Sequence, residues 1–473
     1  MQPTTAFAPQ KELWGHPRGL YILFFTELWE RFSYYGMRAI LVLFLISTVT
    51  SDNPGYGWEK TEALALYGWY TMAVYLASIP GGLMADRWLG QKKAVMVGGW
   101  LLVIGHSILA VDALWAFYAG LTFIVLGVGG LKPNISSMVG NLYRQGDDRR
   151  DKGFTIFYIG INIGAFLSSL IVGGVGEIYG WHYGFALAGI GMAIGQIVYM
   201  YGQKYLIGIG EFLGKADNPD REAMKRPLTK VEKDRVLVIL ISFALIIVFW
   251  GAFEQAGGLM NIYTLEKTDR MLFGWEVPAS WFQSINAFFI ITLGTVVANF
   301  WYKWKRKGKE SSSLFKMAIG VMIMGWGFLF MTGASLEYQN SGQSAMYWLV
   351  FAYLLHTIGE LCASPVALSY ITKLAPVKYA SLMMGAYFAA SGLGNKVAGL
   401  VGEWSQTAGE LEIFTGIAIF CTIIGILVLI MLKPLKRLAH GAEETDTHER
   451  IPIKNTEGIE TIEPEASRKN PKR

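Results

Sequence analysis

Long apolar runs separated by short polar stretches dominate the pattern of this sequence. A helix that crosses a lipid bilayer needs about 20 predominantly apolar residues. Runs of this kind form two groups on either side of a polar stretch, near residues 20–48, 62–86, 93–111, 114–140, 154–175 and 183–206, and then near 236–265, 281–303, 314–335, 343–371, 379–402 and 411–433. The pattern therefore predicts an all-α membrane protein with six plus six transmembrane helices.

The same pattern predicts the order of domains. Residues 1–206 are expected to form an N-terminal six-helix bundle, and residues 236–433 a C-terminal one. The polar stretch 207–235 is expected to link the two bundles in the cytoplasm. Residues 434–473 are charged and nearly free of aromatic side chains, which is typical of a disordered tail.

Basic residues in the loops predict the orientation, because Lys and Arg in short loops mark the cytoplasmic side. Alternate loops are basic, at 87–93, 144–152, 221–235 and 303–309, and the opposite loops contain only Lys60, Lys267 and Arg270. This alternation continues along the whole chain and indicates an even number of spans with both termini in the cytoplasm. We expect an integral protein of a bacterial plasma (inner) membrane.

Composition mainly excludes other classes of protein and other kinds of site. The chain is 53% hydrophobic and only 16% charged, with a formal net charge of +5, whereas soluble domains contain about 25% charged residues. The two cysteines, Cys362 and Cys421, lie far apart in apolar runs, so neither a disulfide framework nor a metal site is expected. No zinc signature, nucleophile elbow or nucleotide loop appears. We therefore expect no cofactor, no enzymatic activity and no nucleic-acid partner.

The first apolar run contains a stripe of polar side chains. Glu27, Glu30, Arg31, Tyr34 and Arg38 stand at positions i, i+3, i+4, i+7 and i+11, so a helix places them on one face. Each central charge costs roughly 2.5–3.5 kcal/mol on insertion scales, and such residues by default indicate function. The alternatives are an ion pair that only joins helices, or a span whose charges lie at its end.

Acids beside a guanidinium also form a plausible proton switch. If the pair separates in one conformation, Glu30 can take up a proton, and it releases that proton when the pair forms again. Arg31 itself stays charged throughout. The first span is therefore a candidate site of proton coupling.

Three further charges lie within predicted spans. Lys132 lies in the fourth span, where Pro133 and nearby glycines can loosen the helix. Glu254 lies in the seventh span and Glu360 in the tenth. We expect Arg38 to pair with Glu254 towards the outside, and Lys132 with Glu360 towards the inside. Each of the three could instead be a structural ion with a satisfied partner.

Three polar residues in predicted spans indicate a binding site less specifically than the charges do. They are Tyr75, Asn162 and Asn286. In a spanning helix, such side chains more often make hydrogen bonds between helices than contacts with a substrate.

Several segments resemble the proton-dependent oligopeptide transporter (POT) family of the major facilitator superfamily. Residues 27–32 match its Glu-x-x-Glu-Arg-Phe motif, and residues 82–93 are similar to the superfamily's cytoplasmic gating loop between helices two and three. Residues 157–164, 281–286 and 359–365 extend the similarity over nearly the whole membrane region. The resemblance implies two six-helix bundles around a central cavity, and import of di- and tripeptides with protons by alternating access.

The resemblance also implies a role for each matching position. Arg38 and Lys132 would hold the peptide carboxylate, and Asn162, Asn286 and Glu360 would hold its amino terminus. The implied proton-coupling residues are Glu27, Glu30, Arg31 and Glu254. The implied peptide-binding residues are Tyr34, Tyr35, Arg38, Tyr75, Lys132, Asn162, Trp250, Asn286, Glu360, Ser364, Tyr387, Phe388 and Ser391. The implied gating motif is Gly82, Asp86, Arg87 and Gly90.

Two features depart from many relatives. Tyr387 stands where members similar to this chain often have Trp, which affects the size of the side-chain pocket and the selectivity. The polar link 207–235 is too short for the two extra helices that many bacterial members insert there.

Other functions remain as alternatives. The same scaffold could carry nitrate, an amino acid or a drug, but an anion carrier would not need Glu360 to hold an amine. A membrane-embedded enzyme would need a nucleophile, metal or cofactor constellation, and a peptide sensor would bind without net flux. The expected partners are small peptides, protons and the lipid bilayer, and the sequence leaves the oligomeric state undefined.

Overall fold

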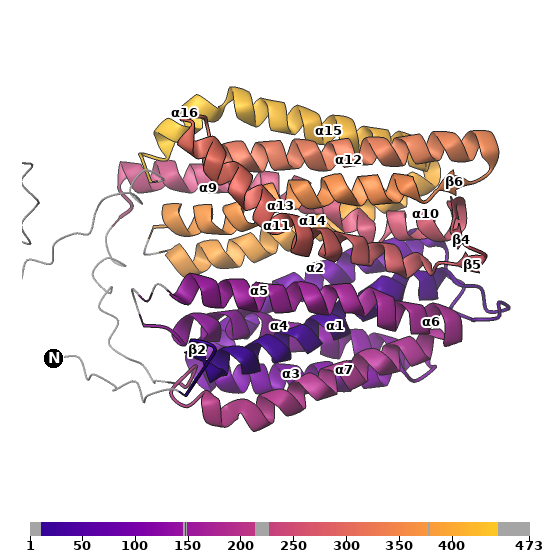
Figure 1. Cartoon of the computed structure of the whole chain (residues 1–473), viewed down its shortest axis with the longest axis horizontal. Helices are drawn as coiled ribbons and strands as arrows, with labels where there is room; N and C mark the ends of the chain where they lie inside the picture. The colour runs from indigo at the N-terminus through magenta and orange to yellow at the C-terminus, as the bar shows by residue number, and fades with distance from the viewer. Residues whose placement is uncertain (1–10, 145–146, 148, 213–226, 377–378, 443–473) are drawn as a thin grey trace, which may run out of the picture.

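A computed structural model describes residues 11–144, 147, 149–212, 227–376 and 379–442. Long helices run nearly parallel to one another in two bundles that lie side by side (Figure 1). The earlier part of the chain forms one bundle and the later part the other. Each bundle contains its own hydrophobic core, so the interface between them is free to carry polar groups.

The N-terminal bundle follows the predicted spans closely. It consists of α1 (Arg18–Ile46), α2 (Lys60–Met84) with the π-helical turn η1 (Ala85–Leu89), α3 (Gln91–Leu109), α4 (Leu114–Asn141), α5 (Arg149–Ser168) with η2 (Ser169–Gly173) and α6 (Gly174–Tyr179), and α7 (Trp181–Gly202) with η3 (Gln203–Tyr205). Helix α4 continues through Pro133 without a break, so the predicted loosening of the helix there is not observed.

The C-terminal bundle consists of α9 (Lys230–Phe253), η4 (Glu254–Ala256), α10 (Leu259–Lys267), η5 (Ala279–Gln283), α11 (Ser284–Arg306), α12 (Ser313–Ser341), α13 (Tyr347–Leu374), α14 (Ala380–Ala408), α15 (Glu410–Ile430) and α16 (Leu432–Leu438). Helix α9 begins within the predicted linker, because Thr229 and Glu232 form a capping box there. Helix α16 continues past residue 434, where the tail was expected to begin. The rest of that tail, from residue 443, lies outside the described residues.

Nine helices in the described part of the chain are long and apolar enough to cross a membrane. The other three predicted spans coincide with α1, α2 and α14. Helix α1 is less apolar than these nine because it carries Glu27, Glu30, Arg31 and Arg38. The helices agree with an integral membrane protein, and the count of twelve spans stays a prediction.

Short strand pairs lie at the two ends of the bundles. Strands β3 (Thr268–Asp269) and β6 (Ser344–Ala345) pair in parallel, and β4 (Met271–Leu272) pairs antiparallel with β5 (Trp275–Glu276). These strands share one end of the molecule with η5, the end that the loop charges predict to be outside (Figure 1). We call it the exterior end, and the opposite end the cytoplasmic end.

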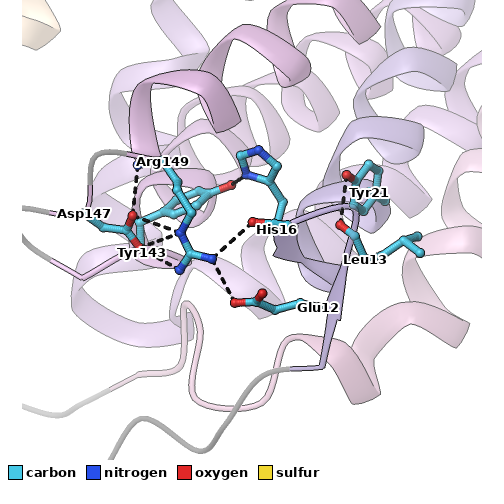
Figure 2. Close-up of polar contacts among 8 residues, drawn as sticks. Glu12, Leu13, His16, Tyr21, Tyr143, Asp147 and Arg149 are labelled. Atoms are coloured by element: carbon cyan, nitrogen blue, oxygen red, sulfur yellow. Dashed lines mark hydrogen bonds and ion pairs between the residues drawn. The ribbon is translucent and has the colours of Figure 1, made fainter.

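At the cytoplasmic end, β1 (Glu12–Leu13) and β2 (His16–Pro17) form a hairpin before α1. Figure 2 shows that Arg149, at the start of α5, binds Asp147 and reaches Glu12 of this hairpin at 2.9 Å. His16 Nδ1 lies 2.8 Å from the Tyr143 hydroxyl. These contacts tie the start of the chain to the α4–α5 connection within the N-terminal bundle.

The two bundles touch most closely along α2 and α14. A Cβ added to Gly68 would lie 3.0 Å from the Cα of Gly399, and one added to Gly399 would lie 2.8 Å from the Cα of Gly68. Any larger side chain at either position would force the helices apart, so small residues allow this close approach.

Candidate functional site

Two acids share one base in the middle of α1. Arg31 Nε lies 2.9 Å from Glu27 Oε1 and 2.5 Å from Glu30 Oε2, and all three side chains are at most 3% exposed. Among the described residues, Arg31 is the cation that pairs with Glu30. Two carboxylates and one guanidinium leave one buried negative charge uncompensated, which a proton or a further cation can neutralise.

A second charged group joins the two bundles. Arg38 Nη1 donates to both oxygens of Glu254, at 2.9 and 2.8 Å, as the sequence predicted. The Tyr67 hydroxyl of α2 donates to Glu254 Oε2 at 2.9 Å. All three side chains are buried. An acid of the C-terminal bundle is thus held by a base and a phenol of the N-terminal bundle.

The seventh span is not the continuous helix that the sequence pattern predicted. Helix α9 ends at Phe253, Glu254 opens the short turn η4, and α10 begins only at Leu259. Gly257 and Gly258 stand in the interruption. An unwound backbone inside a membrane is tolerated only where it faces other protein segments or a cavity. Broken helices of this kind often form the binding sites of transporters.

The expected pair between Lys132 and Glu360 is not formed, so this prediction is wrong for the arrangement observed. Lys132 Nζ instead lies 3.8 Å from the centre of the Tyr75 ring, which is a cation–π contact within the N-terminal bundle. Glu360 accepts a hydrogen bond from Asn286 Nδ2 at 2.9 Å, within the C-terminal bundle. Lys132 and Glu360 thus each contact a residue of their own bundle.

Both charges nevertheless lie near the interface between the bundles. The Tyr75 ring under Lys132 meets Trp250 of the C-terminal bundle. Glu360 is held by Asn286 of α11, and α11 packs against α5 of the N-terminal bundle. Lys132 has no ion-pair partner among the described residues. A cation of one bundle and an acid of the other thus face the same interface.

The remaining polar residues are held mainly within their own bundles. Asn162 Nδ2 donates to the Tyr158 carbonyl one turn earlier at 2.9 Å, and Asn286 also donates to Thr357 Oγ1 at 3.0 Å. Ser391 Oγ donates to the Tyr387 carbonyl at 3.1 Å. Their amide and hydroxyl groups have short-range partners that a bound molecule could replace.

Aromatic side chains surround the charges. Tyr35 lies under Arg38, with 4.8 Å from the guanidinium carbon to the ring centre, and Tyr34 lies near Arg31 at 5.9 Å. Tyr75 and Trp250 approach each other across the interface, with ring centres 6.5 Å apart. Tyr387 packs against Phe388. Trp250, Ser364 and Tyr387 also line a small apolar pocket that α9, α12, α13 and α14 form.

The implied gating motif lies around the turn η1. Gly90 has φ +76°, and a Cβ there would lie 2.6 Å from the backbone nitrogen of Phe212, so glycine is required for this turn. Asp86 and Arg87 are exposed and form no ion pair with other described residues. A Cβ added to Gly82 would meet no neighbouring atom within 4 Å, so a side chain fits there. A gating role for these residues stays a prediction.

Tyr67, Glu177 and Asn261 join the bundles and were not predicted from the sequence. Tyr67 holds Glu254 and lies two helical turns before Tyr75 on α2, so spacing could have indicated it. Glu177, at the end of α6, accepts hydrogen bonds from the backbone nitrogens of Ala279 (2.8 Å) and Ser280 (2.7 Å). Asn261 Nδ2 donates to the Ala39 carbonyl at 2.8 Å. No sequence signal pointed to Glu177 or Asn261.

All hydrogen bonds and ion pairs that join the bundles through described residues lie between the middle and the exterior end. Besides the contacts of Arg38, Tyr67, Glu177 and Asn261, they include the pair Lys60–Glu266 and the contacts of Trp281, Gln283 and Ser284 with Leu170, Ala39 and Phe166. Helix α11 contains no buried residue after Ile290.

Comparisons with known proteins agree with this architecture. The sequence model of the POT family matches residues 92–211 and 220–411. A peptide transporter of Yersinia enterocolitica, YePEPT, is 35% identical over 94% of this chain and all of its own length. A di-/tripeptide transporter of Lactococcus lactis is 35% identical over 91% of this chain and 98% of its own length. A crystal structure of a peptide transporter of the POT family with sulfate superposes with a TM-score of 0.84, at 33% identity, over 91% of this chain and 97% of that one.

Proposed function

Because this chain belongs to the POT family, we propose that it is a proton-coupled symporter that imports di- and tripeptides by alternating access. The observation that carries the proposal is the placement of opposite charges on the two bundles. Lys132 lies on Tyr75, which meets Trp250 across the interface, and Glu360 is held by Asn286 of α11, which packs against α5. A peptide with a free carboxylate and a free amine matches this arrangement. The names of the relatives from Yersinia and Lactococcus support the same substrate class.

In this proposal Lys132 binds the peptide carboxylate. Its ammonium rests on the Tyr75 ring, and a carboxylate forms a stronger, charge-assisted contact than a ring face does. Arg38 becomes available for the same task when its bond to Glu254 opens. Fixed charged ends select by length, because an extended chain spans at most about 3.3–3.6 Å per residue. Two or three residues are the expected size.

Glu360 and Asn286 receive the peptide amine at the opposite side. Asn286 holds one oxygen of Glu360 and so orients the carboxylate. Asn162 provides a carboxamide from the N-terminal bundle. The aromatic side chains Tyr34, Tyr35, Trp250 and Phe388, together with Tyr387, tolerate side chains of many kinds because their contacts are apolar and not directional.

The proton enters the cycle at the acids of the interface. A proton on Glu30 removes the uncompensated charge of the group around Arg31, and a proton on Glu254 breaks its bond to Arg38. The second event releases the N-terminal bundle from the C-terminal one at the exterior end. A proton that moves down about 100 mV gains about 2.3 kcal/mol, which allows roughly fifty-fold accumulation of a neutral solute.

The arrangement observed corresponds to the inward-facing state of this cycle. The polar contacts of Arg38, Glu177 and Asn261 between the bundles lie between the middle and the exterior end, which supports closure at that end. The loop charges support an orientation with both termini in the cytoplasm, and the bacterial relatives support a location in a bacterial inner membrane.

Uptake of a labelled dipeptide into proteoliposomes, with and without an imposed inward proton gradient, tests the proposal. We expect uphill accumulation with the gradient, competition by other di- and tripeptides, and no competition by nitrate or single amino acids. Glu30→Gln should retain binding and exchange but lose accumulation, while Lys132→Ala and Glu360→Ala should lose uptake. Accumulation that is independent of the gradient, or competition by nitrate alone, would overturn the proposal.

A further inference from the structure

A dense group of cations lies at the cytoplasmic end of the C-terminal bundle. Three cations stand in the last turn of α11, two follow in the connection to α12, and three belong to α16. All are exposed. We call this group the basic collar; it consists of Lys303, Lys305, Arg306, Lys307, Lys309, Lys433, Lys436 and Arg437.

The collar is one surface, because its two segments are joined. Lys436 Nζ lies 2.9 Å from Glu310 Oε2 and so brings α16 beside the α11–α12 connection. Arg235 Nε donates to the Ala439 carbonyl at 3.2 Å, and His440 Nε2 lies 2.7 Å from Asp234 Oδ2, which holds the end of α16 against α9. The cations therefore occupy defined positions.

The collar carries a large excess of positive charge. Burial raises the pKa of Glu310, but hydrogen bonds from Ser312 and Lys436 outweigh burial and lower it to about 2, so this acid stays ionised at neutral pH. Glu310 compensates Lys436 alone. The other cations of the collar have no ion-pair partner among the described residues, which leaves them available to an anion.

An apolar surface runs directly into the collar. The side chains of Val296 and Phe300 on α11 are 60% and 51% exposed. One turn further, Trp301 and Trp304 lie beneath Lys316 and Lys309, at 5.4 and 4.1 Å from ammonium to ring centre. Apolar residues, then indole rings, then cations are the order of acyl chain, interface and headgroup in a bilayer.

We propose that the basic collar binds the headgroups of anionic phospholipids in the cytoplasmic leaflet. The exposed flank of α11 receives the acyl chains, the indoles lie at the level of the glycerol, and the collar binds the phosphates. The cytoplasmic half of α11 has no buried residue in the protein. Bound lipid therefore supplies the packing that keeps this half of the helix in place. This inference does not depend on which solute is transported.

The test compares lipid binding by the purified full chain and by a variant that has lost three collar cations, Lys303→Gln/Lys305→Gln/Arg306→Gln. Binding of phosphatidylglycerol and of phosphatidylcholine is titrated by native mass spectrometry and by the shift in Tm. We expect saturable binding of phosphatidylglycerol by the natural chain. The variant should bind about a hundredfold more weakly, because each cation near an anionic surface strengthens binding about fivefold.

The matched control is Lys93→Gln/Lys152→Gln/Lys204→Gln, which removes three exposed cations from the same end of the N-terminal bundle. It should bind phosphatidylglycerol as the natural chain does. Inorganic phosphate and glycerol 3-phosphate at equal concentration should neither stabilise the protein nor displace the lipid. If the α11 variant fails to fold, Lys433→Gln/Arg437→Gln on α16 tests the same collar, with an expected loss of about twenty-five-fold.

Three results would overturn the inference. Equal loss of binding in the N-terminal control would show that only the total charge matters. Equal binding of phosphatidylcholine would show that the headgroup charge is irrelevant, and displacement by inorganic phosphate would show a simple anion site.

Discussion

The charged side chains at the two ends of this molecule have different kinds of partner. At the exterior end, groups from both bundles bind one another, with Arg38 and Tyr67 on Glu254, and Glu177 on the first backbone nitrogens of η5. At the cytoplasmic end, two ion pairs among the described residues, Arg149 with Glu12 and Lys436 with Glu310, stay within one bundle. The same kinds of residue thus join the bundles at one end and only shape each bundle at the other.

The difference shows where a conformational change has to be controlled. A buried ion pair is weak evidence for stability, since removal of charges from water costs about as much as their attraction returns. Such a pair can however depend steeply on a single proton. The exterior contacts therefore suit a switch, and the exposed cytoplasmic pairs do not, because solvent screens them.

The largest effect is expected when the exterior ion pair loses one partner. Arg38→Gln leaves Glu254 buried without its cation, which should cost about 3–5 kcal/mol, lower the Tm of the purified protein and abolish uphill uptake. Arg38→Gln/Glu254→Gln should recover most of the Tm but not the coupling, because no buried charge remains unpaired. If the double variant is as unstable as Arg38→Gln alone, the two charges do not act as a pair.

A smaller effect is expected at the second exterior contact. Glu177→Ala removes two charge-assisted hydrogen bonds from the start of η5 and should favour the exterior-open state by about 2 kcal/mol or more, a shift of more than tenfold. Spin labels at Tyr183 and Leu272, both exposed on opposite bundles, should report a longer distance once Cys362 and Cys421 are replaced by serine. Glu12→Ala, which breaks a contact inside one bundle, is the control and should leave this distance unchanged.

Tyr67→Phe should have a moderate effect. It removes one hydrogen bond to Glu254, worth about 1 kcal/mol, and leaves Arg38 in place. We expect uptake to continue at a reduced rate, measured as initial uptake at several external pH values. If the variant transports as well as the natural chain at every pH, the hydrogen bond of Tyr67 to Glu254 does not contribute to transport.

Lys60→Gln should have the smallest effect. Its ion pair with Glu266 joins the bundles, but the two side chains are 36% and 32% exposed, and pairs of this kind contribute about 0–1 kcal/mol. Neither the Tm nor peptide uptake should change measurably, and raising the salt concentration should not change that result. A large effect would show that the exterior end depends on screened surface charges as well as on buried ones.

Much of the site was accessible from spacing within single helices. The stripe on α1 follows from the positions of its residues, and Arg38 could be assigned to Glu254 because both lie towards the same end of their spans. The error at Lys132 and Glu360 has a different origin. Their contact depends on how far apart the bundles lie at that level, and one sequence serves every state of the cycle.

The break in the seventh span escaped prediction for a related reason. Phe249–Glu254 continues an apolar pattern, and Gly257 and Gly258 alone do not end a membrane helix, since glycine is common in such helices. The turn η4 is stable because Arg38 and Tyr67 of the other bundle satisfy Glu254 there. A partner more than 180 residues away in the chain has no trace in the local pattern.

The sequence by itself determined the all-helical membrane character, the boundaries of most spans and the charged face of α1, because hydropathy and helical spacing act over a few turns. Only the tertiary structure decided which charges meet across the interface and where the seventh span breaks. Those features arise from packing between two bundles, and that packing depends on distances that neighbours in sequence do not encode.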